Sequence, residues 1–344
     1  MIYSVLLTFF FIFLSFFRKK SKFLTVIILF YIWLLWGWNY WNGDYEAYER
    51  KYNFFLTNVL DSNYEIGYSA LMILSNQFGL DFQQFFQVVS LLIIICWGRF
   101  ILFFSKTPAL YSIILLFVFF PLDYVLLRNT LAFSIVLQGL LSIMKNAKYK
   151  YIKYILCVLL ASTIHSSALF YLSLIIAFKF KRINKLHVVF GVIFTLLIAI
   201  LYKGILLNYL GDNSEGRAVA YSHTIMAFLY FSVIQILNYI IIHVCYKRMN
   251  NLEGGIYNMF IRVNLILLFL IVLYFVLSIT VRLFRNIAIV NTLLMLNICS
   301  CYFKNIIKYK ILLLLYIITL FLMFILPVID DTLLSLYKYN LLFN

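Results

Sequence analysis

Apolar runs long enough to cross a membrane follow one another along almost the whole of this sequence. A transmembrane helix needs roughly 20 consecutive apolar residues, and runs of about this length recur with only short polar segments between them. Hydrophobic residues make up 65% of the 344 positions and charged residues 12%, and the mean hydropathy is +1.00. The sequence therefore predicts an all-α integral membrane protein with a single polytopic membrane domain over 1–344.

About ten of these runs are predicted to be transmembrane helices. They are residues 2–17, 23–41, 84–104, 109–127, 129–144, 186–207, 225–246, 256–279, 286–303 and 311–329. The first run has no basic segment before it, and the basic cluster 18–22 follows it. This order is the reverse of a cleavable signal peptide, so we expect the first run to remain as a span.

The positions of the basic residues predict the orientation of the chain. When the basic cluster 18–22 is placed in the cytoplasm, alternation of the spans puts most of the 28 Lys and Arg residues on the cytoplasmic side, as the positive-inside rule requires. Every acidic residue except Glu253 then falls on the outer side. The formal net charge of +16 is thus explained mainly by topology, and no nucleic-acid partner is predicted.

Two segments do not fit simple alternation of spans. Residues 154–178 are apolar but have basic clusters at both ends, so a single crossing would place one cluster outside. A re-entrant hairpin that turns at 163–167 avoids this, because each arm can reach about the middle of the bilayer. Residues 66–80 are short and partly polar, so we expect a partly inserted helix on the outer side, within an outer loop region over 42–83.

Three arginines on the outer side are candidates for binding an anion. A charged side chain at membrane depth costs a few kcal/mol, so it is a functional candidate by default. Arg128 lies between two spans with almost no loop, and Arg282 and Arg285 are spaced to share one helix face. One guanidinium group can donate two parallel hydrogen bonds to phosphate oxygens, so Arg282 and Arg285 together can hold a diphosphate. The alternative is that all three are interfacial arginines whose charges reach the lipid head groups.

His165 lies at the expected tip of the hairpin, with serine and threonine neighbours. A histidine at this place can bind phosphate or carry a proton. The alternative is a structural histidine held by hydrogen bonds.

Carboxylates alternate with aromatic residues in the segments 43–50 and 61–68. Three tryptophans precede these segments, Trp36, Trp38 and Trp41. This combination suits carbohydrate, because carboxylates accept hydrogen bonds from hydroxyl groups and aromatic faces cover sugar rings. Asp44 or Glu65 can also act as a base toward an attacking hydroxyl. An aromatic belt at the membrane interface and a solvated loop are the alternatives.

Several common catalytic motifs are absent from the sequence. It has no glycine-rich phosphate loop, no dinucleotide-binding turn, no His-Glu-x-x-His and no Asp-x-Asp. Its five cysteines lack the paired spacing of a metal or redox site, so we expect them to be apolar packing residues. The sequence predicts no cofactor and no metal.

Five segments together resemble the EpsG-like branch of the Wzy-type bacterial polysaccharide polymerases. In order, they are Asp44, Tyr45 and Tyr48; Tyr64, Glu65, Gly67 and Tyr68; Arg128, Asn129 and Ala132; residues 161–169 around His165; and the segment at Arg282. The family usually has glutamine where this chain has Asn129, which weakens a role for that amide but not for Arg128.

The resemblance implies a GT-C-like membrane transferase architecture and a metal-independent glycosyltransferase. Such a polymerase joins polyprenyl-diphosphate-linked oligosaccharide repeats at the outer face of the bacterial cytoplasmic (inner) membrane, in the biosynthesis of an O-antigen of lipopolysaccharide or of a capsule. Its substrates are carried on undecaprenyl diphosphate or a similar membrane lipid. A chain-length regulator and a flippase are implied as partners.

The resemblance and the residues together assign roles as follows. Arg128, Arg282 and Arg285 would bind the diphosphates, His165 would contact phosphate or transfer a proton, and Asp44 or Glu65 would bind the acceptor or act as base. Asn129, Tyr45, Tyr48 and Tyr68 would contact the substrate. A lipid-linked oligosaccharide flippase is the first alternative, although the sequence shows no internal repeat. An O-antigen ligase or a membrane acyltransferase is the second.

Overall fold

The fold is described by a computed structural model that covers residues 1–55, 65–180, 225–247, 255–274, 280–301 and 306–343, with Gly191, Ile193 and Met249. These residues are almost entirely helical and include no β-strand, which confirms the all-α class. They form two compact units, one of Met1–Leu172 with Leu320–Asn344 and one of Ser173–Thr319. The predicted single domain over 1–344 stays a prediction.

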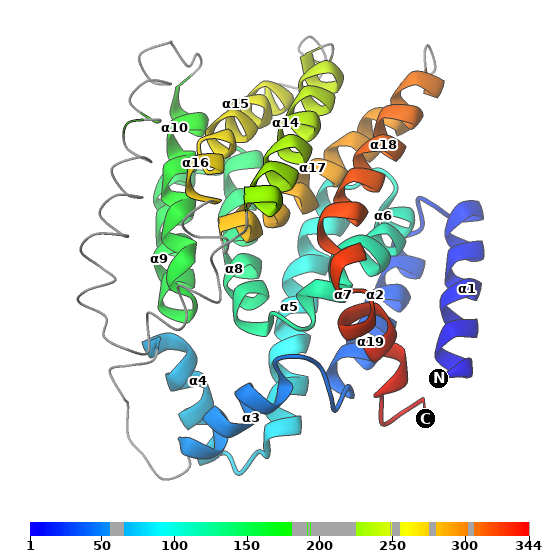
Figure 1. The fold of residues 1–344 in the computed structure, drawn as a ribbon, viewed down its shortest axis with the longest axis vertical. Coiled ribbons are helices and arrows are strands. Elements are labelled where there is room, and N and C mark those ends of the chain that lie inside the picture. Colours follow the sequence, from blue (N-terminus) through cyan, green and yellow to red (C-terminus); the bar gives the residue numbers. More distant parts are fainter. Residues whose placement is uncertain are drawn as a thin grey trace. The chain divides into compact units, whose positions relative to one another are not determined.

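The first unit holds the N-terminal helices and the end of the chain (Figure 1). Its helices are α1 (Ile2–Phe17), α2 (Lys22–Gly37), α3 (Tyr45–Phe54), α4 (Ile66–Gln77), α5 (Phe82–Phe104), α6 (Pro108–Ile114), α7 (Phe120–Asp123), α8 (Leu127–Met144), α9 (Lys150–Ile164) and α19 (Ser335–Lys338). The first unit also contains two π-helical turns, Leu115–Phe119 and Asp330–Leu334, and the 3-10 segment Leu326–Val328. A second 3-10 segment, Ser166–Ser173, ends at the boundary with the second unit.

The second unit holds the described helices between these parts of the chain. They are α10 (Leu174–Lys179), α14 (Ile225–Lys247), α15 (Ile256–Leu268), α16 (Ile271–Tyr274) and α17 (Val281–Cys301). Helix α18 (Ile306–Phe324) begins in this unit and ends in the first. Within the second unit, the amides of Asn264 and Asn291 form a reciprocal pair of hydrogen bonds, 3.0 and 2.8 Å, between α15 and α17.

The lengths of the helices agree with a membrane protein. Six described segments are long and apolar enough to cross a bilayer, namely Phe82–Phe104, Leu127–Met144, Ile225–Lys247, Ile256–Tyr274, Val281–Ser300 and Ile307–Val328. Four shorter apolar segments are Ile2–Phe17, Lys22–Gly37, Pro108–Asp123 and Ser166–Lys179. The predicted span 186–207 falls outside the described residues, apart from Gly191 and Ile193. The total of about ten spans and the GT-C-like architecture stay predictions.

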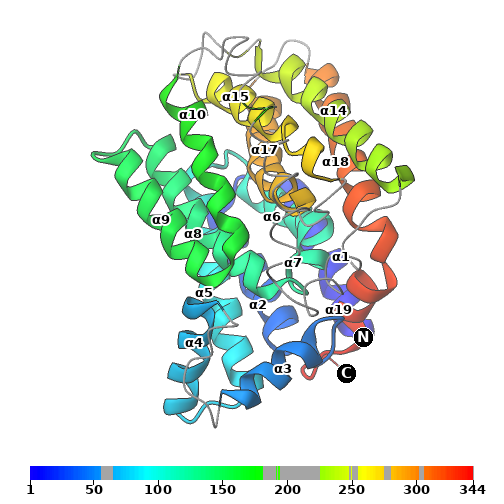
Figure 2. The ribbon, with the colours of Figure 1, turned by 60° about the vertical axis from the view of Figure 1, so that its left-hand side comes forward.

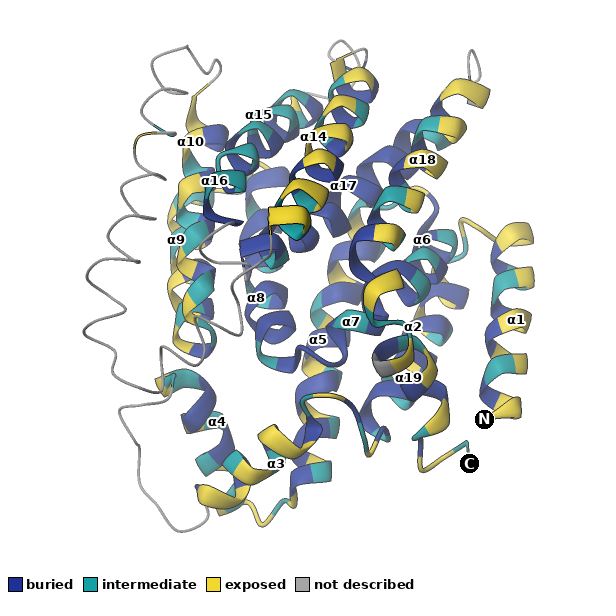
Figure 3. Cartoon of the chain, in the orientation of Figure 1, coloured by how far each residue is buried: buried dark blue, intermediate teal, exposed yellow. Residues whose placement is uncertain are grey.

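Helix α1 has its small polar side chains inside and its large apolar ones outside. Ser4 and Thr8 are buried against Tyr31 of α2, whose hydroxyl lies 2.7 Å from Thr8 Oγ1 and donates to the Ser4 carbonyl at 2.6 Å. Phe9 and Phe13 are exposed, and Figure 3 shows this exposed side of α1. Small residues that pack inward and apolar residues that face outward are typical of a helix in lipid.

The second predicted span ends earlier than its hydropathy predicts. Helix α2 ends at Gly37, not at residue 41, because Asn39 leaves the helix to pair with the C-terminal segment. The Asn39 amide donates to the Tyr339 carbonyl at 2.9 Å, and the Asn340 amide donates to the Leu35 carbonyl at 3.0 Å. The end of the chain thus stabilises the end of α2.

Helix α17 begins earlier than its predicted span. It starts at Val281, where the sequence predicts a span from residue 286. Arg282 and Arg285 therefore lie in one continuous helix.

Trp36 is part of the core of the first unit. It is fully buried against Trp97 and Phe120, and its indole N–H donates to the Tyr124 carbonyl at 3.2 Å. The interpretation of Trp36 as a carbohydrate contact is therefore wrong. Trp38 and Trp41 are partly exposed.

Helices α3 and α4 lie at one end of the first unit, beside the first turns of α5 (Figures 1 and 2). Asp81 begins α5 with a capping box, since its side chain accepts from the Gln84 N–H at 2.7 Å and the Gln84 side chain accepts from the Asp81 N–H at 3.0 Å. Tyr52 of α3 packs on Phe82 and Phe85 of α5. The predicted partly inserted helix 66–80 is thus seen as α4, and its insertion stays a prediction.

Helices α8 and α9 pack closely along each other. A Cβ atom on Gly139 would lie 3.0–3.1 Å from atoms of Tyr154 and Cys157, so a larger residue there would push these neighbours away by a few tenths of an ångström. After α9 the chain turns back at His165, and the Tyr154 hydroxyl donates to the Tyr171 carbonyl at 2.7 Å. The turn at His165 lies where the sequence predicts a hairpin tip, and re-entry of 154–178 into the membrane stays a prediction.

Candidate active site

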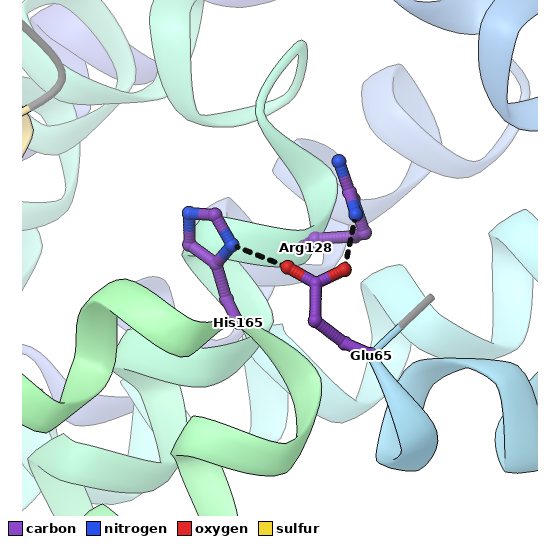
Figure 4. Close-up of polar contacts among 3 residues, drawn as sticks. All are labelled: Glu65, Arg128 and His165. Atoms are coloured by element: carbon purple, nitrogen blue, oxygen red, sulfur yellow. Dashed lines mark hydrogen bonds and ion pairs between the residues drawn. The ribbon is translucent and has the colours of Figure 1, made fainter. Parts of the chain in front are cut away.

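Three side chains from separate segments meet in the first unit (Figure 4). Nη1 of Arg128 lies 2.5 Å from Oε2 of Glu65, and Nδ1 of His165 lies 3.2 Å from Oε1 of the same carboxylate. The side chains are 24%, 23% and 12% exposed for Arg128, Glu65 and His165. The carboxylate of Glu65 therefore joins a cation and an imidazole in a mostly desolvated place. We call these three residues the Glu65 cluster.

Each member of the Glu65 cluster lies at the end of a helix. Glu65 has extended backbone and directly precedes α4, and His165, also extended, directly follows α9. Arg128 is in the first turn of α8. An arginine at a helix N-terminus is unfavourable for the helix dipole, so a neighbouring carboxylate stabilises it there.

A glycine lets α4 approach α9. A Cβ atom on Gly67 would lie 2.9 Å from the carbonyl carbon of Thr163, a distance that real Cβ atoms essentially never show. Gly67 is two residues after Glu65, and Thr163 is two residues before His165. The close contact of the two backbones therefore places the carboxylate next to the imidazole.

Two tyrosine rings flank the guanidinium group of Arg128. Its Cζ atom lies 5.6 Å from the ring centroid of Tyr48 on α3 and 5.9 Å from that of Tyr68 on α4. Cation–π contacts of this kind help to hold a guanidinium in place. Burial raises the pKa of both phenols, and although the charge of Arg128 acts in the opposite direction, both keep their protons.

Glu65 is ionised over the whole physiological pH range. Burial alone would raise its pKa, but the hydrogen bond with His165 and the charge of Arg128 outweigh burial and lower the pKa to about 2. An ionised carboxylate only accepts hydrogen bonds. The nitrogen of His165 that faces Glu65 therefore carries a proton.

Buried polar atoms without a hydrogen-bond partner lie in and beside the Glu65 cluster. Nε of Arg128, Nε2 of His165 and the hydroxyl of Tyr68 are buried and make no hydrogen bond within the part of the chain that the structure describes. Buried polar groups are nearly always satisfied, so such atoms in one place indicate a site for water or a ligand. The Nε–H group of Arg128 can only donate a hydrogen bond, and the hydroxyl of Tyr68 can readily donate one. Both therefore suit an oxygen atom of a phosphate or of a hydroxyl group as acceptor.

Other predicted site residues lie in the same unit. Asp44 directly precedes α3, and its negative charge acts on Tyr48. Tyr45 is buried, and its hydroxyl donates to Oε1 of Gln83 at 2.7 Å. Asn129 is buried in the first turn of α8. Substrate contact by these residues stays a prediction.

Arg282 and Arg285 lie on α17 in the second unit. Arg282 is partly exposed, whereas Arg285 is fully buried and donates from Nη2 to Oδ1 of Asn286 at 3.4 Å. Binding of a diphosphate by this pair stays a prediction.

The sequence identified the members of the cluster but not their pairing. Glu65 was expected to bind an acceptor or act as base, and its ion pair with Arg128 was not foreseen. The roles of Gly67 and Thr163 were also missed. The small residues beside Glu65 and His165 were the available signal, because two backbones approach this closely only where a side chain is missing.

Comparison with known proteins gives one match. Neither the curated proteins nor the solved structures contain a significant match to this chain. The model of the EpsG family, in contrast, matches residues 22–341, a range that includes every member of the Glu65 cluster and both α17 arginines. The chain therefore belongs to the EpsG family.

Proposed function

We propose that this protein is a polysaccharide polymerase which joins polyprenyl-diphosphate-linked oligosaccharide repeats at the outer face of the bacterial cytoplasmic membrane. The growing chain leaves its lipid diphosphate and is transferred to a hydroxyl group of the next lipid-linked repeat. The product is an O-antigen or a capsular polysaccharide. Membership of the EpsG family supports the general activity, a membrane polysaccharide polymerase.

The observation that carries this proposal is the state of Arg128. Its guanidinium group is at the start of an apolar helix, and it is held by Glu65 and flanked by Tyr48 and Tyr68. Its Nε atom is buried without a partner among the described residues. A fixed guanidinium with an unused donor can bind a diphosphate and stabilise the negative charge that develops as it leaves.

The position of Arg128 also supports an anionic ligand. The N-terminus of α8 directs backbone N–H groups and the positive end of its dipole to the same place. Glu65 balances one positive charge when no ligand is bound. The guanidinium is thus kept in position even when no anionic ligand is bound. The proposed reaction needs no metal ion, because the guanidinium supplies the positive charge.

The proposal is tested by deletion of the gene, followed by gel analysis of the surface polysaccharide and of the lipid-linked fraction. A polymerase deletion should accumulate one lipid-linked repeat on the outer face and lose the chain-length ladder. A wild-type copy should restore the ladder. Loss of all surface sugar with repeats kept on the inner face would indicate a flippase. Intact polymer that stays on its lipid carrier would indicate a ligase, and polymer that lacks only acyl groups would indicate an acyltransferase.

A further inference from the structure

The two ring nitrogens of His165 have different surroundings. Nδ1 lies 3.2 Å from the carboxylate of Glu65. Nε2 is buried and makes no hydrogen bond to any residue that the structure describes. Figure 4 shows that this second nitrogen faces away from Glu65.

The charge of Glu65 decides the tautomer of the imidazole. Because the carboxylate stays ionised, it accepts a hydrogen bond, and Nδ1 must be the donor. A neutral imidazole that is protonated on Nδ1 has its lone pair on Nε2. That nitrogen is then able to accept a proton but not to donate one to a phosphate.

Glu65 itself is a poor proton acceptor. A general base works best when its pKa is near the working pH, whereas the pKa of Glu65 is about 2 while it is paired with His165 and Arg128. Its two oxygens are also already in contact with these two partners. Glu65 therefore fits a residue that orients others.

We propose that Nε2 of His165 is the general base that takes the proton from the acceptor hydroxyl, and that Glu65 is a positioning residue which orients the imidazole through Nδ1. This assignment rests on the proposed polymerase function. The acceptor oxygen forms a bond to the anomeric carbon of the donor sugar, and its proton moves to Nε2. The bond from that carbon to the diphosphate oxygen breaks, and its electron pair leaves with the lipid diphosphate beside Arg128. The imidazolium then loses its proton to water after the product departs.

The charged and titratable neighbours of His165 are consistent with this role. Helices α4 and α8 pack on α9. The charged and titratable groups that they bring to the C-terminal end of α9 are Glu65, which directly precedes α4, Tyr68 of α4, and Arg128 of α8. Glu65 stabilises the imidazolium that forms, and Arg128 opposes a lasting positive charge. Tyr68 stays neutral, because burial raises its pKa. The imidazole can therefore take a proton and lose it again in each cycle.

Two substitutions of His165 separate proton transfer from phosphate contact. His165→Asn keeps a donor near the position of Nδ1, so the contact with Glu65 is retained, and it removes Nε2. His165→Gln places an amide near the position of Nε2, which can donate to a phosphate oxygen but cannot accept a proton. Ser166→Ala is the matched control, because Ser166 is the exposed neighbour of His165.

The assay uses the lipid-linked repeat that accumulates in the deletion strain, added to proteoliposomes that contain the full chain. The initial rate of polymer formation is measured over a range of pH. Both His165 variants should lower kcat by roughly 10²–10⁴-fold with little change in KM, and both should lose the fall in rate on the acid side. Glu65→Gln should lower kcat less than either His165 variant and leave KM nearly unchanged, because the imidazole keeps Nε2 but loses the carboxylate that orients it.

The outcomes distinguish this inference from the proposed function. If wild-type protein forms no polymer from the lipid-linked repeat, the proposed function fails and the inference fails with it. If the wild type forms polymer and His165→Gln forms it at the wild-type rate, the role of His165 is to contact phosphate, and the inference is overturned. It is also overturned if the acid limb persists in both His165 variants, or if Asp44→Asn and not His165→Asn removes it. Loss of the acid limb in His165→Asn with a stable protein supports it.

Discussion

Glu65 and Arg128 form an ion pair at 2.5 Å although 63 positions separate them in the sequence. Neither side chain is well solvated, so each compensates for the cost of removing the other's charge from water. The pair also leaves Nε of Arg128 without a partner in the described part of the chain. A pair that only stabilised the fold would not need such an unused donor, so the ion pair is best understood as the means of holding Arg128 for a ligand.

Replacing Arg128 by lysine should abolish long polymer while the protein remains in the membrane. An ammonium group is a point charge, so it cannot bind Glu65 and present further N–H groups in a fixed plane. Loss of one such group typically costs on the order of 10²–10³-fold in rate. Arg99→Lys is the matched control, because Arg99 is exposed on α5. The measurement is the polysaccharide ladder with the membrane level of each protein, and a full ladder from Arg128→Lys would refute the assignment.

Exchanging the two charges separates stability from function. Glu65→Arg alone places two cations together and should lower the amount of protein in the membrane. Combining it with Arg128→Glu restores an opposite-charge pair, so the protein level should recover. Polymer should still be absent, because the cation then sits before α4 and not on α8. Protein level and polymer are measured in the same strains, and recovery of both would show that the pair is only structural.

Replacing Gly67 by alanine should reduce activity without a change in any charged group. The added Cβ would lie 2.9 Å from the Thr163 carbonyl carbon, so α4 must move away from α9. Glu65 then moves away from His165, and a displacement of about 1 Å can cost on the order of 10²-fold. Gly43→Ala is the control, since nothing lies within 4 Å of its added Cβ. Equal polymer yields from the two variants would contradict the role of this contact.

Hydropathy was sufficient to predict most helices, but not their ends. Helix α1 was predicted with its observed bounds, Ile2–Phe17, because an apolar run closed by a basic cluster has a clear limit. Helix α2 was predicted too long, because the contact of Asn39 with Asn340 stops it. That contact joins two distant parts of the chain, and local sequence contains no information about it.

The site was predicted in its members and not in its geometry. A charge in an apolar setting is costly, so Arg128 was identified from its surroundings alone. The burial of Trp36 was not predicted, because a tryptophan near the end of an apolar helix can face either the core or the membrane interface. The partner of Glu65 depends on how α4, α8 and α9 pack, and this packing includes close approaches at Gly67 and Gly139 that hydropathy does not reveal.

The charge of Glu65 should also be visible in the pH dependence of stability. Burial would raise its pKa, but His165 and Arg128 lower it from 4.5 to about 2. A carboxyl group whose pKa is lower in the folded state stabilises the fold above its unfolded pKa, and this contribution is lost as the pH falls through the folded value. The wild type should therefore lose this contribution between about pH 4.5 and pH 2, whereas Glu65→Gln lacks it throughout.

Thermal unfolding in detergent provides the measurement. At pH 7 the Tm of Glu65→Gln should be lower than that of the wild type, and the difference should narrow as the pH falls from about 4.5 toward 2. Glu46→Gln serves as control, since Glu46 is exposed on α3 and should show no such narrowing. A Tm difference for Glu65→Gln that is the same at pH 7 and near pH 2 would mean that the carboxylate charge does not stabilise the fold. The contacts with Arg128 and His165 would then be weaker in solution than their distances indicate.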